Sequence, residues 1–256
     1  MQWALAAVFL VLASVLVLAL QPWRTGEVYA TGVGEHRVVM LQDGSRLSLN
    51  SATKVRASLS SSQRLVFVEA GEALFEVAKD ASRPFLVTAN GAEVKATGTA
   101  FLVRLRPSTH RISTSLEVTL IEGQVVLRPP AGLVAEAAGA GAGPVVMTAG
   151  ERVRVDGAMA ASRISKVRVD RSSLDRAVAW TRGEASFDDV TLNEAVAEMN
   201  RYSSKPIVIV DADRLKALRV SGLFRTGDST SFARAVAALH GLDVREHSDR
   251  LELASR

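Results

Sequence analysis

The side chains that could carry out catalysis or bind a metal are few and scattered along the chain. The histidines are His36, His110, His240 and His247. They lie in unrelated sequence contexts, and no two of them have the spacing expected of metal ligands. The chain contains no cysteine, which excludes disulfides, thiolate catalysis and cysteine-based metal sites.

Two aspartate pairs and one glycine pair are the remaining candidates for chemistry. Asp188-Asp189 and Asp211-x-Asp213 could suggest acid–base catalysis or calcium binding. Each pair precedes a segment with helical periodicity, where carboxylates commonly cap the helix, and we favour that interpretation. Gly32-x-Gly34 lacks the strand-to-helix context of a phosphate loop. The sequence therefore predicts no catalytic residue, cofactor or metal ligand, and we do not expect an enzyme.

The first residues of the chain favour a membrane anchor. Residues 1–20 are nearly all apolar and carry no charge. A helix of this length spans roughly 30 Å, the thickness of a bilayer's hydrocarbon core. We therefore expect a transmembrane helix at residues 1–21 and a juxtamembrane linker at residues 22–28. A cleaved signal peptide is the alternative, but no Lys or Arg precedes the apolar run, which is longer than a typical signal core.

Residues 29–156 predict an all-β domain, an antiparallel rolled sheet or sandwich. Short apolar segments with a period of two alternate with turn signals that supply positive φ angles. These turns are Asp43-Gly44, Asn90-Gly91 and Glu122-Gly123. The first turn joins residues 38–41 to residues 47–49 as a hairpin. The nearly uncharged Pro-, Ala- and Gly-rich stretch between residues 129 and 144 is expected to be a flexible loop.

After a charged linker at residues 157–179, the periodicity becomes helical. Thr191 and Glu194 form a capping box at the start of the first helix. Its apolar face is predicted to contain Leu192, Ala195, Val196, Met199 and Tyr202. A second helix begins near Asp228 or Ser229. Its inner face is predicted to contain Phe232, Val236 and Leu239.

The two helices belong to an internal repeat. The segment from Leu192 to Met199 aligns with the segment from Phe232 to Leu239, and each copy lies between short apolar strands. Residues 180–256 therefore predict a small α+β domain of two βαβ-like units. The net charge of +4 comes from dispersed arginines, which is typical of a solvated surface and not of a nucleic-acid interface.

One strand of this domain carries the candidate partner-binding residues. In the expected strand at residues 218–224, side chains alternate between the two faces. The core-facing positions would be Val220, Gly222 and Phe224, and the outward-facing positions would be Arg219, Ser221 and Leu223. Leu223 is a large apolar side chain without an evident internal partner. A free sheet edge beside it would suit strand addition by a partner.

Motifs in a fixed order across residues 29–224 resemble those of the FecR domain. In the β part they are Tyr29-x-Thr31-x-x-Gly34-Glu35-x-Arg37, Leu41-x-Asp43-Gly44-Ser45-x-Leu47-x-Leu49-Asn50, Gly71-Glu72-Ala73-x-Phe75-x-Val77, Arg83-Pro84-Phe85-x-Val87, Gly98-Thr99-x-Phe101-x-Val103, Glu122-Gly123-x-Val125 and Ala149-Gly150-Glu151. In the C-terminal part they are Trp180-x-x-Gly183, Asn200-Arg201-Tyr202 and Val220-x-Gly222-x-Phe224.

The resemblance implies an inner-membrane regulator of bacterial cell-surface signalling, a transmembrane sensor and anti-sigma protein. Its bulk would lie in the periplasm and contact the signalling domain of a TonB-dependent outer-membrane receptor. It would regulate an extracytoplasmic-function sigma factor of the iron-starvation type, linking it to iron uptake. Residues 180–256 would resemble the short N-terminal domain of secretins and TonB receptors. This orientation opposes the weak positive-inside preference of Arg24.

Two expectations accompany this resemblance. Members of the family normally carry a charged cytoplasmic segment before the span, which binds the sigma factor, whereas here the apolar run begins at Met1. We therefore expect the reading frame to continue upstream of Met1. The alternative function is structural: an envelope-assembly protein with the β domain as a scaffold and the C-terminal module for oligomerisation.

Overall fold

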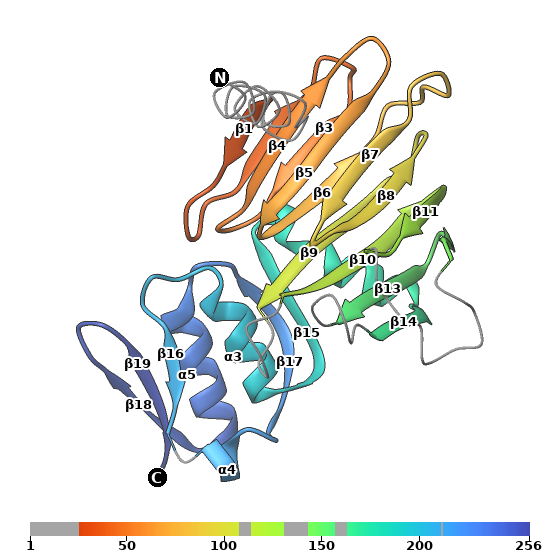
Figure 1. Ribbon diagram of the computed structural model, residues 1–256. Coiled ribbons are helices and arrows are strands. Elements are labelled where there is room, and N and C mark those ends of the chain that lie inside the picture. Colours follow the sequence, from red (N-terminus) through yellow and green to blue (C-terminus); the bar gives the residue numbers. More distant parts are fainter. Residues whose placement is uncertain (1–25, 108–113, 131–142, 157–162, 211) are drawn as a thin grey trace, which may run out of the picture.

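The structure is a computed structural model that describes residues 26–107, 114–130, 143–156, 163–210 and 212–256 (Figure 1). The predicted transmembrane helix at residues 1–21 lies outside these ranges, as do most of the juxtamembrane linker and most of the predicted loop after residue 129. Within the described ranges, no helix is both long enough and apolar enough to cross a bilayer.

Two seven-stranded sheets make up the β domain, which spans residues 27–168. In spatial order, the first sheet contains β1 (Glu27–Ala30), β4 (Lys54–Leu59), β5 (Arg64–Ala70), β7 (Phe85–Ala89), β8 (Ala92–Ala96), β11 (Gln124–Arg128) and β12 (Val145–Thr148). The second contains β14 (Arg163–Arg168), β13 (Glu151–Asp156), β10 (Thr114–Glu122), β9 (Ala100–Pro107), β6 (Glu72–Glu76), β3 (Arg46–Leu49) and β2 (Arg37–Met40). One aliphatic cluster with a few phenylalanines joins the two sheets.

The predicted hairpin and the mostly-β character of this domain are confirmed. β2 and β3 pair antiparallel around the Asp43-Gly44 turn. At the second predicted turn, Asn90 and Gly91 both have positive φ, 48° and 77°, as a two-residue hairpin connection requires. One pair departs from the antiparallel expectation, because β5 and β7 are parallel. The chain crosses to the other sheet as β6 between them, so it re-enters the first sheet in the same direction.

The β domain also extends into the segment that we expected to be a linker. β14 pairs antiparallel with β13 along residues 163–168. Most residues of β14 are polar or charged, so the apolar alternation that marks a strand is weak here. The short helices α2 (Arg171–Ala177) and η2 (Ala179–Arg182) then lead out of the β domain.

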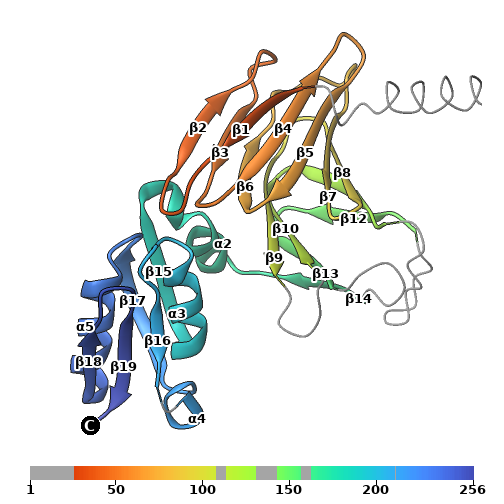
Figure 2. The same cartoon turned by 60° about the vertical axis from the view of Figure 1, so that its left-hand side comes forward.

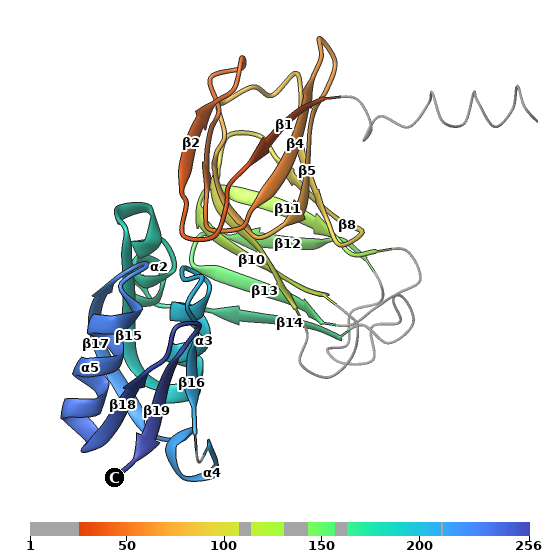
Figure 3. The ribbon, with the colours of Figure 1, turned by 90° about the vertical axis from the view of Figure 1, so that its left-hand side faces the viewer.

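The C-terminal module, residues 184–255, contains two longer helices, one short helix and two small sheets (Figures 2 and 3). Its elements are β15 (Glu184–Thr191), α3 (Leu192–Asn200), β16 (Ile207–Ile209), α4 (Ala212–Leu215), β17 (Arg219–Arg225), α5 (Ser229–His240), β18 (Leu242–Glu246) and β19 (Leu251–Ser255). β15 pairs with β17, whereas β19 pairs with both β16 and β18.

The repeat is therefore a strand-helix-strand unit, but it is not the βαβ unit that we predicted. In both copies the strand before the helix and the strand after it belong to different sheets. A single apolar cluster includes both helices and strands of both sheets. The buried face of α5 is wide, because Phe232, Ala233, Val236 and Ala237 are all buried. The helix can therefore pack against strands of both small sheets.

Three side-chain predictions in this module have definite outcomes. The capping box is confirmed: the Thr191 hydroxyl accepts from the Glu194 amide, and the Glu194 carboxylate accepts from the Thr191 amide. Leu239 is 68% exposed and not on the inner face, because the buried face of α5 is centred on the neighbouring positions. Tyr202 is buried, but it follows the end of α3 and packs in a different cluster.

The first aspartate pair, Asp188-Asp189, does not cap a helix as predicted, and the prediction for Asp211-x-Asp213 is not tested. Asp189 has a φ of 51° and lies in a β-bulge of β15, and Asp188 forms an ion pair with Arg176 at 3.0 Å. The N-cap of α3 is Thr191 instead, which leaves the two carboxylates one turn too early. Asp211 lies outside the described residues, and Asp213 lies within α4.

Candidate functional site

The C-terminal module docks on the second sheet of the β domain through a small apolar contact. Trp180 of η2, Leu102 of β9 and Tyr202 form a separate buried cluster. The edge of the His36 imidazole approaches the Trp180 indole, with the ring centres 6.2 Å apart. This contact is too small to fix the orientation of two domains by itself. The polar groups around it complete the junction.

A network of charged and polar side chains surrounds this apolar contact. We call it the junction network: Asn50, Glu72, Arg104, Glu198, Arg201 and Tyr202. Glu72 of β6, whose side chain is 2% exposed, accepts from Nη2 of Arg201 and from Nδ2 of Asn50, each at 2.7 Å. The first three members belong to the β domain and the last three to the module, so the ion pairs Glu72–Arg201 and Arg104–Glu198 bridge the two parts.

Glu198 of α3 holds the centre of the network. Its carboxylate accepts from Arg104 of β9 and, at 2.6 Å, from Nη1 of Arg201. The Tyr202 hydroxyl donates to the same carboxylate at 3.0 Å and accepts from Nδ2 of Asn50 at 3.2 Å. Two carboxylates therefore face two guanidinium groups, and every member has at least two partners.

The backbones of the two parts also approach closely here. A Cβ atom on Gly34, which has a φ of +75°, would lie 2.8 Å from the carbonyl oxygen of Tyr202. The Gly34 amide donates to the Ser51 hydroxyl at 2.8 Å, and that hydroxyl donates to the carbonyl of Arg201. The loop after α3 is held in place by Asn200, whose side chain exchanges two hydrogen bonds with the backbone of Ile207.

Electrostatic effects keep Glu198 and Arg201 of the junction network ionised at neutral pH. Burial raises the pKa of Glu198, but the charges of Arg104 and Arg201 outweigh it and lower the pKa to about 2. Burial lowers the pKa of Arg201, and the charges of Glu72 and Glu198 outweigh it and raise the pKa above its ordinary value. Burial and then the charge of Glu198 raise the pKa of Tyr202, so its hydroxyl remains a donor.

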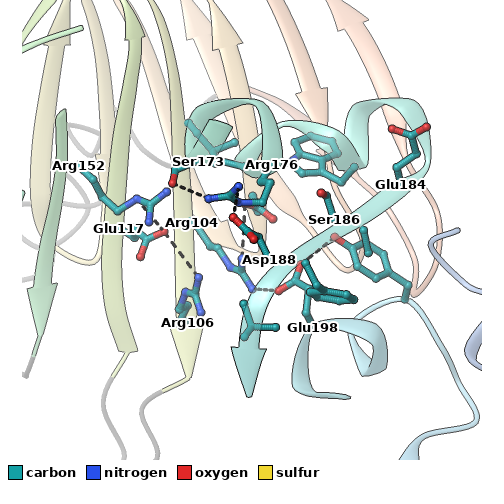
Figure 4. A pocket seen from close by; sticks show the side chains of 18 residues that line it. Arg104, Arg106, Glu117, Arg152, Ser173, Arg176, Glu184, Ser186, Asp188 and Glu198 are labelled. Atoms are coloured by element: carbon teal, nitrogen blue, oxygen red, sulfur yellow. Dashed lines mark hydrogen bonds and ion pairs between the residues drawn. The ribbon is translucent and has the colours of Figure 1, made fainter. Parts of the chain in front are cut away.

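Next to the junction lies a cleft of about 320 Å³ between the two parts (Figure 4). Strands β9, β10 and β13, with Glu72 at the start of β6, form one wall and β15 forms the other, with α2 beside them. The charged residues of the first wall are Glu72, Arg104, Arg106, Glu117 and Arg152, and those of β15 are Glu184 and Asp188. Apolar lining comes from Leu102, Trp180, Phe187 and Val190.

Three arginines share one carboxylate on the first wall. Glu117 of β10 lies 2.7 Å from Nη2 of Arg154, 3.6 Å from Nη2 of Arg106 and 3.8 Å from Nε of Arg152. Burial raises the pKa of Glu117, but these positive charges lower it overall. Burial, followed by repulsion from Arg104, lowers the pKa of Arg106. The wall therefore carries more positive charge than its own carboxylates compensate.

The candidate partner-binding residues of β17 lie outside both the junction and the cleft lining. Arg219, Ser221 and Leu223 are all exposed, as the alternation predicted. Two of them contact the bulge of β15, because Nη1 of Arg219 donates to the Asp189 carbonyl and the Asp189 amide donates to the Ser221 hydroxyl. Leu223 is 60% exposed. On the opposite face Val220 is buried and Phe224 is half-buried, whereas Gly222 is exposed.

Sequence reasoning missed the charged side chains that build the junction and the cleft. Asn50, Glu72, Arg201 and Tyr202 were noticed only as parts of motifs. Arg104 and Glu117 lie within apolar strands, and a charge at such a position is the signal that could have identified them. Among the histidines, His110 lies outside the described residues. The described residues contain no group of three possible metal ligands.

Comparisons with known proteins agree with this architecture. A family model described as FecR protein matches residues 27–126. Two crystal structures of a candidate anti-sigma factor from Parabacteroides distasonis share the fold, each with a TM-score of 0.68 and 22% identity. They cover 91% and 90% of this chain and 100% and 99% of their own chains, so the likeness includes both parts. No curated protein gives a significant match. Residues 27–126 are therefore similar to the FecR family, and the rest of the chain shares its fold with these crystal structures.

Proposed function

We propose that this protein is a signalling regulator of the anti-sigma kind. Two observations support the proposal: the FecR family domain and the two-part fold shared with the candidate anti-sigma factor. In the finer form of the proposal, an N-terminal span anchors the protein in the inner membrane and the rest lies in the periplasm. There it contacts the signalling domain of a TonB-dependent receptor and regulates an extracytoplasmic-function sigma factor of the iron-starvation type.

The junction network is the observation that carries this proposal. A regulator of this kind must pass a binding event from the part that contacts a partner to the part that continues toward the membrane. Hydrogen-bonded ion pairs with little exposure fix the relative orientation of two domains more strictly than an apolar contact does. The N–H groups of each guanidinium must point at the oxygens of its carboxylate. Glu72 and Glu198 each bind Arg201, one from the β domain and one from the module. A partner that moves α3 would therefore also disturb the ion pair between Arg201 and Glu72 in the second sheet.

The outer side of β17 supplies a contact surface for the partner. In the described part of the module, β17 pairs only with β15, so its other edge is free for strand addition. Leu223 is 60% exposed beside that edge, where an apolar partner side chain could cover it. Arg219 and Ser221, which point the same way, would lie at the rim of this contact.

The test compares two exposed leucines of the module. The full chain would be titrated with the signalling domain of the TonB-dependent receptor encoded nearest its gene. We expect Leu223→Asp to weaken binding about tenfold or more, because it places a charge in an apolar contact. Leu239→Asp is the matched control, since Leu239 is 68% exposed on α5. Equal affinities for both variants and the parent would refute the partner surface.

The same variants separate the alternative function. If β17 serves assembly of an envelope structure, Leu223→Asp would convert an oligomer of the chain to a smaller species. Sedimentation of the two variants without any receptor domain would reveal that change. An unchanged sedimentation coefficient together with lost receptor binding supports the signalling proposal.

A further inference from the structure

The cleft beside the junction has the features of a binding site that neither the FecR resemblance nor the proposed receptor contact uses. Its volume, about 320 Å³, lies at the small end of the range of roughly 300–1,000 Å³ that is typical of ligand pockets. Residues from both parts of the chain line it, so a ligand there would touch the β domain and the module together (Figure 4).

One wall of the cleft is the edge of a strand. Glu184, Ala185, Ser186, Phe187 and Asp188, five consecutive residues of β15, all line it. Successive side chains of a strand point to opposite faces, so a cavity touched by every one of them lies along the strand's backbone edge. In the described part of the chain, β15 pairs with β17 alone, so β17 covers only the other edge. The exposed edge can accept another extended chain.

The opposite wall and the adjoining helix η2 each present a hydrogen-bond donor that lacks an acceptor. Nε of Arg106 and Nε1 of Trp180 are buried and have no partner within the described structure, and both residues line the cleft. Trp180 is only 4% exposed. Buried donors are normally satisfied, so these two favour a ligand that brings acceptors.

Charge on this wall selects the kind of acceptor. Glu117 is the nearest carboxylate for three guanidinium groups, of which Arg106 and Arg152 line the cleft at 3.6 and 3.8 Å from it. Arg176, beside them, is paired with Asp188. A carboxylate from a ligand would meet Arg106 and Arg152 without displacing any pair of the junction network, because none of the network's hydrogen bonds uses these two arginines.

We infer that the cleft binds an extended peptide segment with an acidic side chain, which adds to the edge of β15 and places its carboxylate against Arg106 and Arg152. The strand edge supplies main-chain hydrogen bonds, and the arginines supply the preference for Glu or Asp. This site lies on β15, opposite the β17 edge used in the proposed receptor contact, and it does not depend on that contact.

The experiment uses the full chain in detergent and a fluorescein-labelled probe, acetyl-Thr-Val-Glu-Val-Thr-amide, followed by fluorescence anisotropy. The matched probe has Gln in place of Glu. We expect the Glu probe to bind about tenfold tighter or more, since a charge-assisted pair is lost in the Gln probe. Arg106→Gln and Arg152→Gln should each reduce that preference, and Arg128→Gln on the first sheet should not, because Arg128 pairs with Glu93 far from the cleft.

Two further arms test the strand addition itself. Two further probes carry N-methyl groups on alternate residues, one on the odd and one on the even positions. Only one of the two patterns removes the N–H groups that would donate to β15, and that probe should bind about tenfold less tightly than the other. Free glutarate should compete only at much higher concentration than the unlabelled peptide.

Equal binding of the Glu and Gln probes would overturn the inference, and so would competition by glutarate at peptide concentrations. Leu223→Asp should leave the peptide affinity unchanged, which separates this site from the receptor surface. If Arg106→Gln fails to fold, Arg152→Gln still decides the result.

Discussion

Replacement of Glu198 by Gln should weaken the docking of the module on the β domain. Gln keeps the size of the side chain and one acceptor oxygen, but it removes the charge that Arg104 and Arg201 share. Tyr202 would also lose its charged acceptor. Arg201 keeps Glu72, so the change leaves one guanidinium, that of Arg104, with only a carboxylate oxygen 4.0 Å away.

The structure gives the size of the effect. The pKa of Glu198 falls from an ordinary value of 4.5 to about 2, which corresponds to about 3 kcal/mol in favour of the ionised form. Loss of one partner of a buried pair costs about 3–5 kcal/mol. The Glu198 side chain is 23% exposed, so solvent screens part of this interaction. We expect the free energy of unfolding to fall by about 2–3 kcal/mol.

Urea unfolding of the full chain, followed by the fluorescence of Trp180, measures this loss. Of the three tryptophans, Trp3 and Trp23 would first be replaced by Phe so that the signal reports the junction alone. With a slope of about 2 kcal/mol per M urea, the midpoint should shift by about 1–1.5 M. Glu76→Gln is the control, because its ion pair with Arg46 is exposed and worth below about 1 kcal/mol.

The pH dependence tests the cause. Because the pKa of Glu198 is lower in the folded protein, its stabilisation is complete above about pH 4.5 and is lost as the pH falls toward 2. The difference between parent and Glu198→Gln should therefore be constant from about pH 5 to 8 and should close below about pH 4. A loss below about 0.5 kcal/mol, or one that does not change with pH, would refute the electrostatic account.

Three other outcomes are expected. Gly34→Ala should lower the free energy of unfolding by about 2 kcal/mol or more in the same assay, because its Cβ would meet a backbone carbonyl of the module at 2.8 Å. Gly241→Ala, also at positive φ but with nothing within 4 Å, should cost about 1 kcal/mol. Phe224→Ala should lower the free energy of unfolding, measured by calorimetry, by about 2–3 kcal/mol, since its ring is half-buried against two other phenylalanines. If Phe224→Ala costs less stability than Leu223→Asp does, the assignment of the inner and outer faces of β17 is reversed. A reporter active only in the periplasm and fused after Arg256 should be active and membrane-bound. Recovery of a soluble product beginning at Thr31, as signal-peptide cleavage after Val28-Tyr29-Ala30 would give, would contradict the predicted anchor.

The local features of the fold could be predicted because short stretches of sequence determine them. The Asp43-Gly44 and Asn90-Gly91 turns have the positive φ angles that their residue types favour. The capping box at Thr191 depends on two residues three positions apart, so its geometry follows from the start of the helix. β14 was missed for the opposite reason: its pairing with β13 supplies the strand, and its own polar residues do not indicate one.

Assignment of strands to sheets could not be read from periodicity. The repeat in the C-terminal module was detected, yet its period says only that a strand precedes and follows each helix. Which sheet each strand joins depends on tertiary packing, and here α3 and α5 share a core with both sheets. The error for Leu239 has the same origin, because packing centres the buried face of α5 on Phe232, Ala233, Val236 and Ala237 and leaves Leu239 outside it.

The junction lay beyond sequence reasoning because its members are far apart in the chain. Arg104 and Glu198 are separated by 94 residues, and Glu72 and Arg201 by 129. The motif residues Asn50, Glu72 and Tyr202 could each be justified locally, as a turn, a strand or a helix position. Only the folded chain shows that they belong to one network.

The choice of charges at this junction has a consequence for signalling. A well-packed apolar interface of the same area would hold the module at least as firmly, since buried ion pairs recover little more than their desolvation cost. Ion pairs, however, give a strong preference for one orientation, and a single displaced partner removes much of it. Glu198 pairs with Arg104 of the β domain, and Arg201, at the end of α3, pairs with Glu72, so a movement of α3 that breaks one of these bridging pairs also weakens the other. Such a junction holds the module in one orientation on the β domain, and a partner that displaces one charged side chain can free the module from that orientation.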